Sequence, residues 1–261
     1  MTERQFDCEL MKRFAIEIKK QDRSGIYGYT QRALAYNSNK IEGSTLTEEH
    51  TASLFETGTI AADGEIFRAK DIEEANGHFL MFQHMIKTAY EPLSEDLIKQ
   101  YHYYLKVGVF EDRANGYPVG EYKNRRNMVS NIETALPEEV PERMKKMLAD
   151  YHEKDSHTIL DLAKLHSEFE RIHPFQDGNG RTGRIFLFKE CIKNDLVPFI
   201  IQDKNKILYY HVLNKAQQTG EMKDLASYFQ QEQEAYYSIA RDFVYPQTIQ
   251  RQRNFSEDLE L

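Results

Sequence analysis

The sequence predicts an all-α protein, and three observations favour this fold class. Residues 158–172 place their apolar side chains at the spacing of one helical face. Residues 185–192 are apolar almost throughout, as in a helix buried on all sides. The alternation of strands and helices that builds a doubly wound sheet is not found along the sequence. With 40% hydrophobic and 29% charged residues, the 261-residue chain has the composition of a soluble globular protein.

The remaining helices follow from the same apolar patterns. Thr45 or Thr47 can cap the helix expected at about 45–57, and Asp155 or Ser156 can cap the helix of residues 158–172. Pro174 ends that helix, because the residue before a proline is pushed out of the helical region. Residues from about Arg251 onward predict a loosely ordered tail. The further helices are expected at about 4–20, 45–57, 69–89, 94–106, 141–152, 205–218 and 222–240.

One region departs from the helical pattern. Between residues 116 and 133, turn residues separate two short segments, 117–122 and 127–132, that are too polar for a core helix. They predict a small β-hairpin over about 118–132. Lys123, Arg125 and Arg126 form a basic cluster within it. Such a cluster is usually solvated surface, and contact with phosphates or with an acidic target is the alternative.

Composition also restricts the classes of partner that the protein can bind. The net charge of -8 argues against nucleic acid, because there is no excess of cations to neutralise phosphates. No apolar run approaches the roughly 18 residues that span a bilayer, and the N-terminus lacks an apolar signal region, so we expect a cytoplasmic protein without a membrane partner. Cys191 is expected as a small core residue. The histidines near residue 160 lack the spacing and cysteine partners of a zinc site, so His166 is expected in the core.

The loop of residues 173–184, between two predicted helices, concentrates the chemistry. Its Gly-x-Gly-x-x-Gly segment satisfies a dinucleotide-binding fingerprint, but that fingerprint requires a preceding strand and here a helix precedes. A P-loop is excluded too, because Arg184 and Ile185 replace its Lys and Ser/Thr. Taken as it stands, the loop offers a base in His173, a hard-metal ligand in Asp177, and glycine-flanked N–H groups at a helix N-terminus for an anion. Arg181 and Arg184 add cations that can reach a polyphosphate.

The pattern His-Pro-Phe-x-Asp-Gly-Asn-Gly-Arg-x-x-Arg, which residues 173–184 match in full, resembles the signature of Fic (filamentation induced by cAMP) proteins. The resemblance implies an all-helical Fic fold with a β-hairpin flap over the active-site loop. It implies an enzyme that moves AMP from ATP to a Ser, Thr or Tyr hydroxyl of a protein, either an unidentified target or the chain itself. His173 then resembles the catalytic base and Asp177 the ligand of Mg²⁺, with Mn²⁺ as an alternative. The nucleotide-binding residues implied by the resemblance are Asp177, Gly178, Asn179, Gly180, Arg181, Thr182, Gly183, Arg184, Tyr209, Gln217, Val129, Ser130, Asn131 and Ile132.

A second motif, residues 38–43, resembles the (Ser/Thr)-x-x-x-Glu-(Gly/Asn) inhibitory motif of many Fic proteins. Taken alone it is a solvated turn in which Gly43 ends a helix. Beside the first motif, Ser38 and Glu42 are candidate inhibitory residues. A Glu42 carboxylate paired with Arg184 would occupy the arginine that otherwise holds the γ-phosphate, and the nucleotide would be misplaced for in-line attack. Some relatives use this glutamate to remove AMP, so a brake, a switch and a hydrolytic group all stay open.

Several expectations keep their alternatives. Tyr209 either covers the adenine base or packs in the core, and Gln217 stands where many relatives carry Asn. AMP removal, transfer of another nucleotide, and a non-catalytic nucleotide-sensing or partner-binding module are the other functions considered. We expect an N-terminal region of residues 1–93 with the inhibitory motif, a core of residues 94–220, and a C-terminal helix and tail of residues 221–261. The oligomeric state is open, with a homodimer as one option.

Overall fold

The computed structural model describes residues 3–61, 64–129 and 132–245. Helices make up nearly all of the regular structure in these ranges, which confirms the predicted all-α class. The longer elements are α1 (Glu3–Lys20), α2 (Ile26–Ile41), α3 (Glu48–Thr57), α4 (Ala69–Lys87), α5 (Glu95–Lys106), α7 (Val140–Tyr151), α8 (Ile159–Ile172), α9 (Asn179–Lys193), α10 (Lys206–Thr219) and α11 (Lys223–Val244). The short ones are α6 (Phe110–Ala114), the two strands β1 (Met128–Val129) and β2 (Ile132–Glu133), and the 3₁₀ turns η1 (Pro137–Glu139) and η2 (Asp203–Asn205).

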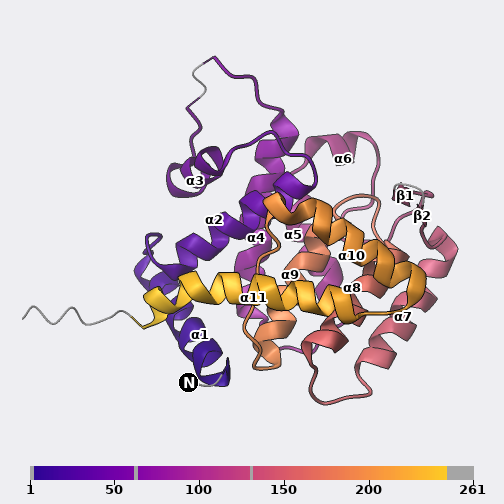
Figure 1. Ribbon diagram of the computed structural model, residues 1–261. Coiled ribbons are helices and arrows are strands. Elements are labelled where there is room, and N and C mark those ends of the chain that lie inside the picture. The colour runs from indigo at the N-terminus through magenta and orange to yellow at the C-terminus, as the bar shows by residue number, and fades with distance from the viewer. Residues whose placement is uncertain (1–2, 62–63, 130–131, 246–261) are drawn as a thin grey trace, which may run out of the picture.

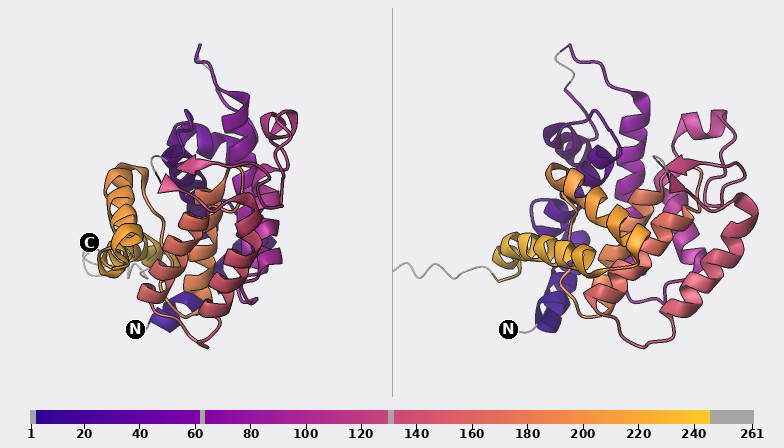
Figure 2. Two further views of the ribbon diagram at one scale, coloured as in Figure 1. Left: turned by 90° about the vertical axis from the view of Figure 1, so that its right-hand side faces the viewer. Right: turned by 45° about the vertical axis from the view of Figure 1, so that its right-hand side comes forward.

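Helix α9 lies at the centre of the molecule. Apart from Gly180 and Lys193, its residues are all buried, so its surroundings are protein on every side, as the apolar run predicted. Helices α4 and α5 pack against each other and against α9, while α8 lies beside α9 and also contacts α10 and α11. Figure 2 shows these layers, with α10 and α11 on one side, α8 and α9 in the middle and α4 and α5 on the other. The two motif segments, residues 38–43 and 173–184, border this same core.

Helix α2 brings the N-terminal motif to this core. It packs against α4 and α9 and also against α1, α3 and α11 (Figure 1). The apolar pattern did not predict a helix here, because the buried face of α2 includes polar side chains. Thr30 shares a hydrogen bond of 2.7 Å with the Tyr236 hydroxyl, and Gln31 donates one of 2.8 Å to the Tyr27 hydroxyl. These bonds satisfy polar groups that would otherwise be costly to bury.

Two predicted caps can be compared with the structure. Thr47 caps α3, and its hydroxyl accepts a hydrogen bond from the His50 N–H, as expected for one of the two candidates. Helix α8 is capped by Thr158, whose hydroxyl accepts from the Asp161 N–H. The prediction of Asp155 or Ser156 was therefore wrong. Both residues precede the segment in which Thr158 and Asp161 form a reciprocal capping box.

The hairpin region is only partly as predicted. Strands β1 and β2 pair antiparallel, with Met128 opposite Glu133 and Val129 opposite Ile132. Residues 117–122 form no strand and include bends only at 119–121, so the first half of the predicted hairpin was wrong. The predicted tail from Arg251, as well as Ser130 and Asn131, lies outside the described residues. None of the helices in the described ranges is both long and apolar enough to cross a membrane.

Candidate active site

The loop of residues 173–178 joins α8 to α9 in a tightly held conformation. His173 ends α8 in the left-handed region, with φ 51° and ψ 62°. The Asn179 side chain pins the loop from within, because it accepts from the Phe175 N–H and donates to the Phe175 carbonyl, both at 2.8 Å. The buried Phe175 ring stacks on His102 of α5, with 3.9 Å between ring centroids. The loop backbone is therefore fixed by its own side chains and by α5.

Helix α9 begins at the glycine-rich segment and points its N-terminus at the site. Gly178 precedes the helix with φ 83°, a left-handed conformation that favours glycine. Its N–H donates a 2.7 Å hydrogen bond to the Asp177 carboxylate. The first N–H groups of a helix lack intrahelical partners and carry the positive end of the helix dipole. Such a first turn is suited to bind an anion, as predicted for this site.

Glu42 of the second motif reaches this turn and pairs with Arg184. Its Oε1 accepts a 2.6 Å hydrogen bond from Arg184 Nη2. The same guanidinium donates from Nε to the Ser38 hydroxyl at 2.9 Å and from Nη2 to the Ser38 carbonyl at 3.0 Å. Arg184 is only 4% exposed, so its donors are taken up within the protein. The two motifs, 142 residues apart, thus form one contact.

The Glu42 carboxylate also covers the backbone of Gly180. A Cβ atom at position 180 would lie 2.3 Å from Glu42 Oε1 and 2.9 Å from Arg184 Nη1. Only glycine leaves room for this approach. The negative charge of Glu42 therefore lies against the first turn of α9, where the helix dipole would also favour a phosphate.

Asp177 lies among three cations on the other side of the same turn. Its carboxylate is 2.9 Å from Lys106 Nζ, 3.3 Å from Lys70 Nζ and 3.3 Å from Arg181 Nη2. Burial alone would raise the pKa of Asp177, but the charges of Arg181 and Lys106 outweigh it and hold the pKa well below its ordinary value. The group is a carboxylate, and its side chain remains 35% exposed. One accessible carboxylate beside a phosphate site fits Mg²⁺, which takes one or two protein oxygens and completes its shell with phosphate and water.

Comparison with known proteins agrees with this geometry. Residues 92–191 match the family model described as Fic/DOC family. This segment of the chain is similar to Fic domains. Curated relatives named protein adenylyltransferase Fic include those of Drosophila virilis, 29% identical over 187 residues, and Nematostella vectensis, 27% identical over 184. Both alignments cover 69% of this chain but only 37% and 42% of the relatives, so the chain spans about two fifths of their length.

Solved structures place nearly the whole chain in the same fold. A Fic domain containing signaling protein from Bacteroides thetaiotaomicron superposes with a TM-score of 0.73 at 23% identity, covering 93% of this chain and 98% of that one. Fic-1 from C. elegans gives a TM-score of 0.66 at 19% identity, covering 89% of this chain and 71% of that one. At this identity the likeness concerns the fold. The predicted all-helical Fic fold is therefore confirmed.

The second Fic-motif arginine, Arg181, is buried as Arg184 is. Arg181 is 2% exposed, and its guanidinium lies 2.5 Å from the Glu74 carboxylate of α4. It also approaches Asn39 of α2, with 3.4 Å between Nη1 and Oδ1. In this structure Arg181 serves to connect α9 with α4, α2 and Asp177. A direct contact with a phosphate, as the sequence predicts, stays a prediction.

The basic cluster of the hairpin region divides into two environments. Arg125 and Arg126 are exposed, as expected for solvated surface. Lys123 is only 3% exposed, so the solvated interpretation was wrong for this residue. Its Nζ donates to the Asn127 side chain at 2.6 Å and to the Thr134 hydroxyl at 2.9 Å. Burial lowers the pKa of Lys123 to about 8.

Tyr209 and Gln217, the residues predicted to contact the adenine base, contact other protein groups in this structure. Tyr209 is 1% exposed and shares a 2.7 Å hydrogen bond with His166, which is itself fully buried, as predicted for a core histidine. The packing alternative thus describes Tyr209 in this structure. Gln217 lies in a different setting, where its Nε2 donates to the Ser167 carbonyl at 3.3 Å. The side chains of Val129 and Ile132, predicted to approach the nucleotide, lie outside the described part of the structure, as do Ser130 and Asn131.

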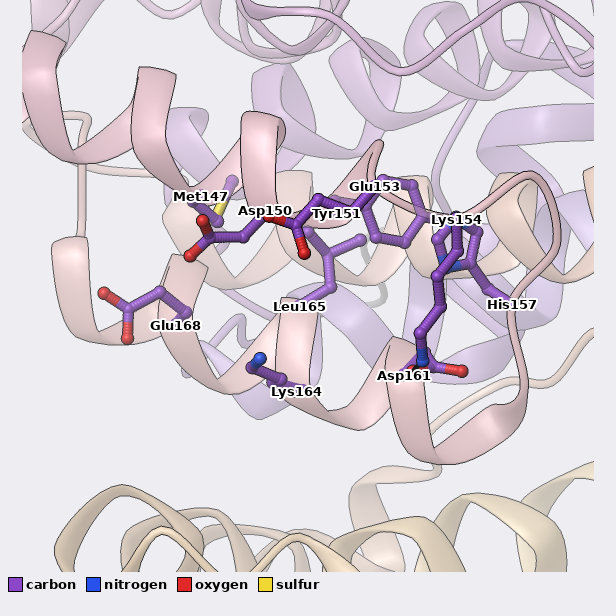
Figure 3. Close-up of a pocket in the computed structure, with 10 residues that line it drawn as sticks. All are labelled: Met147, Asp150, Tyr151, Glu153, Lys154, His157, Asp161, Lys164, Leu165 and Glu168. Carbon is purple, nitrogen blue, oxygen red and sulfur yellow. Dashed lines mark hydrogen bonds and ion pairs between the residues drawn. The ribbon is translucent and has the colours of Figure 1, made fainter.

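Another cavity lies between α7 and α8, away from the Fic motif. Figure 3 shows its lining side chains, among them Lys154 and Asp161, which form an ion pair, and the Tyr151 ring, on which His157 stacks. Its volume is about 130 Å³. None of its lining residues belongs to α2 or to residues 173–184. It is separate from the candidate active site.

The charged residues that support Asp177 were not predicted from the sequence. Lys106 is 1% exposed, and its Nζ lies 2.6 Å from Glu74, 2.8 Å from Asp112 and 2.9 Å from Asp177. Burial raises the pKa of Asp112, and the Lys106 charge opposes that rise. Their only signal in the sequence is a charge on the buried face of an amphipathic helix. This network of buried charges fixes the carboxylate of Asp177, the predicted metal ligand.

We expect Lys106→Met to lower the free energy of unfolding by about 3–5 kcal/mol, because it leaves buried carboxylates without their cation. Urea unfolding at pH 7 measures the loss. The matched control is Lys70→Met, whose side chain is 29% exposed and whose loss should stay near about 1 kcal/mol. Equal losses in the two variants would contradict the structural role of Lys106.

Proposed function

We propose that this chain is a protein adenylyltransferase that moves AMP from ATP to a hydroxyl of a protein, and that Glu42 inhibits it. One observation carries the proposal. A complete Fic motif surrounds the N-terminus of α9, and the Glu42 carboxylate lies on Arg184 and over Gly180, where a phosphate would bind. The relatives named protein adenylyltransferase Fic support the reaction class. We further propose the domain limits given above, with α2 as the inhibitory helix.

In the proposed reaction His173 is the general base. A target hydroxyl attacks the α-phosphorus of ATP, the bond from that phosphorus to the bridging oxygen breaks, and pyrophosphate leaves. The hydroxyl proton passes to His173 Nε2. Arg184, once released by Glu42, would hold the γ-phosphate, and the first-turn N–H groups of α9 would hold the phosphates nearest the glycines. Asp177 would hold Mg²⁺, which when bound neutralises phosphate charge.

The segment of residues 118–132 is proposed to align the target. Its β1–β2 pair is short, and the strand edges of such a pair can bind an extended peptide through backbone hydrogen bonds. Backbone pairing selects a conformation more than a sequence. The Asn127 side chain ties this segment to the loop, because it donates a 2.8 Å hydrogen bond to the Phe175 carbonyl.

Removal of AMP is the second candidate, and one observation favours it. The Glu42 side chain remains 32% exposed although it contacts Arg184, so water has access to a carboxylate beside the phosphate site. A carboxylate in this place can act as a base toward water. Incubation of a target that already carries AMP with the wild-type chain tests it, since release of AMP would require Glu42.

We expect the Glu42→Gly chain to take up label from ATP carrying ³²P at the α position and not at the γ position. Wild type and Glu42→Gly are incubated with each labelled ATP and Mg²⁺, alone and with a cell lysate, and protein-bound label is counted. Equal samples in excess EDTA test the metal requirement. Label from the γ position would identify a phosphotransferase. No label from either position would leave a non-catalytic binding module.

A further inference from the structure

A buried carboxyl group lies directly behind His173. Glu170 is one helical turn earlier on α8, its side chain is 10% exposed, and its Oε2 lies 3.9 Å from His173 Nδ1. Among the described residues, neither His173 Nδ1 nor Glu170 Oε1 has a hydrogen-bond partner, although both are buried. Buried polar atoms without a partner are rare in native proteins and call for a physical explanation.

Gly183 of α9 provides the space for this carboxyl group. A Cβ atom at position 183 would lie 2.8 Å from Glu170 Oε1 and 3.2 Å from His166 Nδ1. His166 Nδ1 is a third buried atom without a partner in the described ranges, while its Nε2 shares a hydrogen bond with Tyr209. Glu170 Oε1 and His166 Nδ1 therefore both lie beside Gly183.

The protonation states suit a hydrogen bond between Glu170 and His173. Burial raises the pKa of Glu170 to about 8, the charge of Arg184 lowers it and that of Glu42 raises it. Burial lowers the pKa of His173 to about 4, helped by the Lys123 charge and opposed by the Glu42 charge, the Glu170 backbone and the Asp177 charge. At pH 7 both groups are neutral. A neutral carboxylic acid keeps an acceptor oxygen, which matches a donating His173.

We propose that Glu170 is the positioning residue of His173: it accepts the His173 Nδ1 proton in a hydrogen bond and so leaves the lone pair on Nε2. The proposal rests on the function proposed above, in which Nε2 takes the proton of the target hydroxyl. The tautomer of a histidine is set by the hydrogen bond that its other nitrogen makes. The gap of 3.9 Å is wider than a hydrogen bond, and catalytic contacts of this kind commonly shorten when substrate binds.

Substitution by glutamine separates this role from simple space filling. The carboxamide of Glu170→Gln has the shape of the protonated acid, with an acceptor and a donor, whereas Glu170→Ala removes both. The matched control is Glu168→Gln, a change at an exposed carboxylate on the same helix that pairs with Arg171 at 3.4 Å. The first readout is ¹⁵N NMR of the histidine rings at pH 7 without nucleotide.

We expect wild type, Glu170→Gln and Glu168→Gln to carry the His173 proton on Nδ1, and Glu170→Ala to lose this preference. In the Glu42→Gly background, Glu170→Ala should lower kcat about 10²-fold with an unchanged KM for ATP, because the base is in the wrong tautomer. Glu170→Gln should restore kcat to within about 3-fold, since it offers the same acceptor. Glu168→Gln should match the parent chain.

Three results would overturn the proposal. They are an unchanged His173 tautomer in Glu170→Ala, loss of the tautomer in Glu170→Gln, and equal kcat losses in both. Should Glu170→Ala not fold, the pH dependence decides: the wild-type His173 signals should shift near pH 8 as Glu170 ionises, and those of Glu170→Gln should not. The NMR readout needs no turnover. A chain that transfers no AMP would refute the proposed function and leave the tautomer result valid.

Discussion

Glu42→Gly is expected to raise the rate of AMP transfer about 10²-fold over wild type, the size of effect that follows when reacting groups misplaced by about 1 Å are realigned. In wild type the Arg184 guanidinium is held by Glu42 and Ser38 and is buried. Removal of the carboxylate frees one N–H of Nη2 and uncovers the backbone of Gly180 for a phosphate. The measurement is the initial rate of label transfer from ATP labelled at the α position.

Two further variants test whether the gain comes from the ion pair. Ser38→Ala removes the hydroxyl that accepts from Arg184 Nε but leaves the pair with Glu42, so its gain should be several times smaller. Glu42→Gln keeps the size of the side chain without its charge and should fall between Ser38→Ala and Glu42→Gly. Glu42 follows the last residue of α2, so glycine suits the backbone there, but loss of the pair with the buried Arg184 should lower stability. A Glu42→Gly rate equal to that of wild type would refute inhibition by Glu42.

The sequence predicted this contact only through resemblance. Local patterns gave the loop, since a helix, a proline and glycines follow one another within residues 172–183. They could not bring Glu42 to Arg184, because that contact joins positions 142 residues apart. Even the helix that carries Glu42 was not predicted from apolar spacing. Its buried face includes Thr30, Gln31 and Asn39, and the partners that make such burial favourable lie elsewhere in the chain.

The same reason explains what the sequence missed around the site. Lys106 ends a predicted helix, where a lysine is ordinarily exposed and favoured by the helix dipole. Its burial follows from carboxylates on α4, on α6 and in the motif loop, at sequence separations of up to 71 residues. The prediction for residues 117–122 was wrong in the opposite sense, because it expected a strand where the structure has none. Its turn residues were recognised, but strand pairing needs a partner, and pairing is confined to residues 128–129 and 132–133.

His173→Ala is expected to lower AMP transfer by about 10² to 10⁴-fold, the range for removal of a general base. His173 closes α8 directly before the pinned loop with its side chain only 17% exposed, and residues 174–178 include no other histidine. The change should be made in the Glu42→Gly background, where the parent rate is high. Binding of ATP should stay within about 3-fold, because the base contacts the target hydroxyl and not the phosphates.

The direction in which AMP transfer should change with pH follows from the pKa of His173. Burial, with help from the Lys123 charge, lowers the pKa of His173 to about 4. Because the neutral imidazole is the proposed base, activity should persist below pH 6.5 and fall only as the pH approaches that lower pKa. Glu42 raises the pKa of His173, so its removal in the parent variant keeps the acid limb low. His157→Ala, at a histidine of the separate cavity, should leave both the rate and the pH profile unchanged. Transfer by His173→Ala at the parent rate would show that another group takes the proton, and Glu170 would then have no base to position.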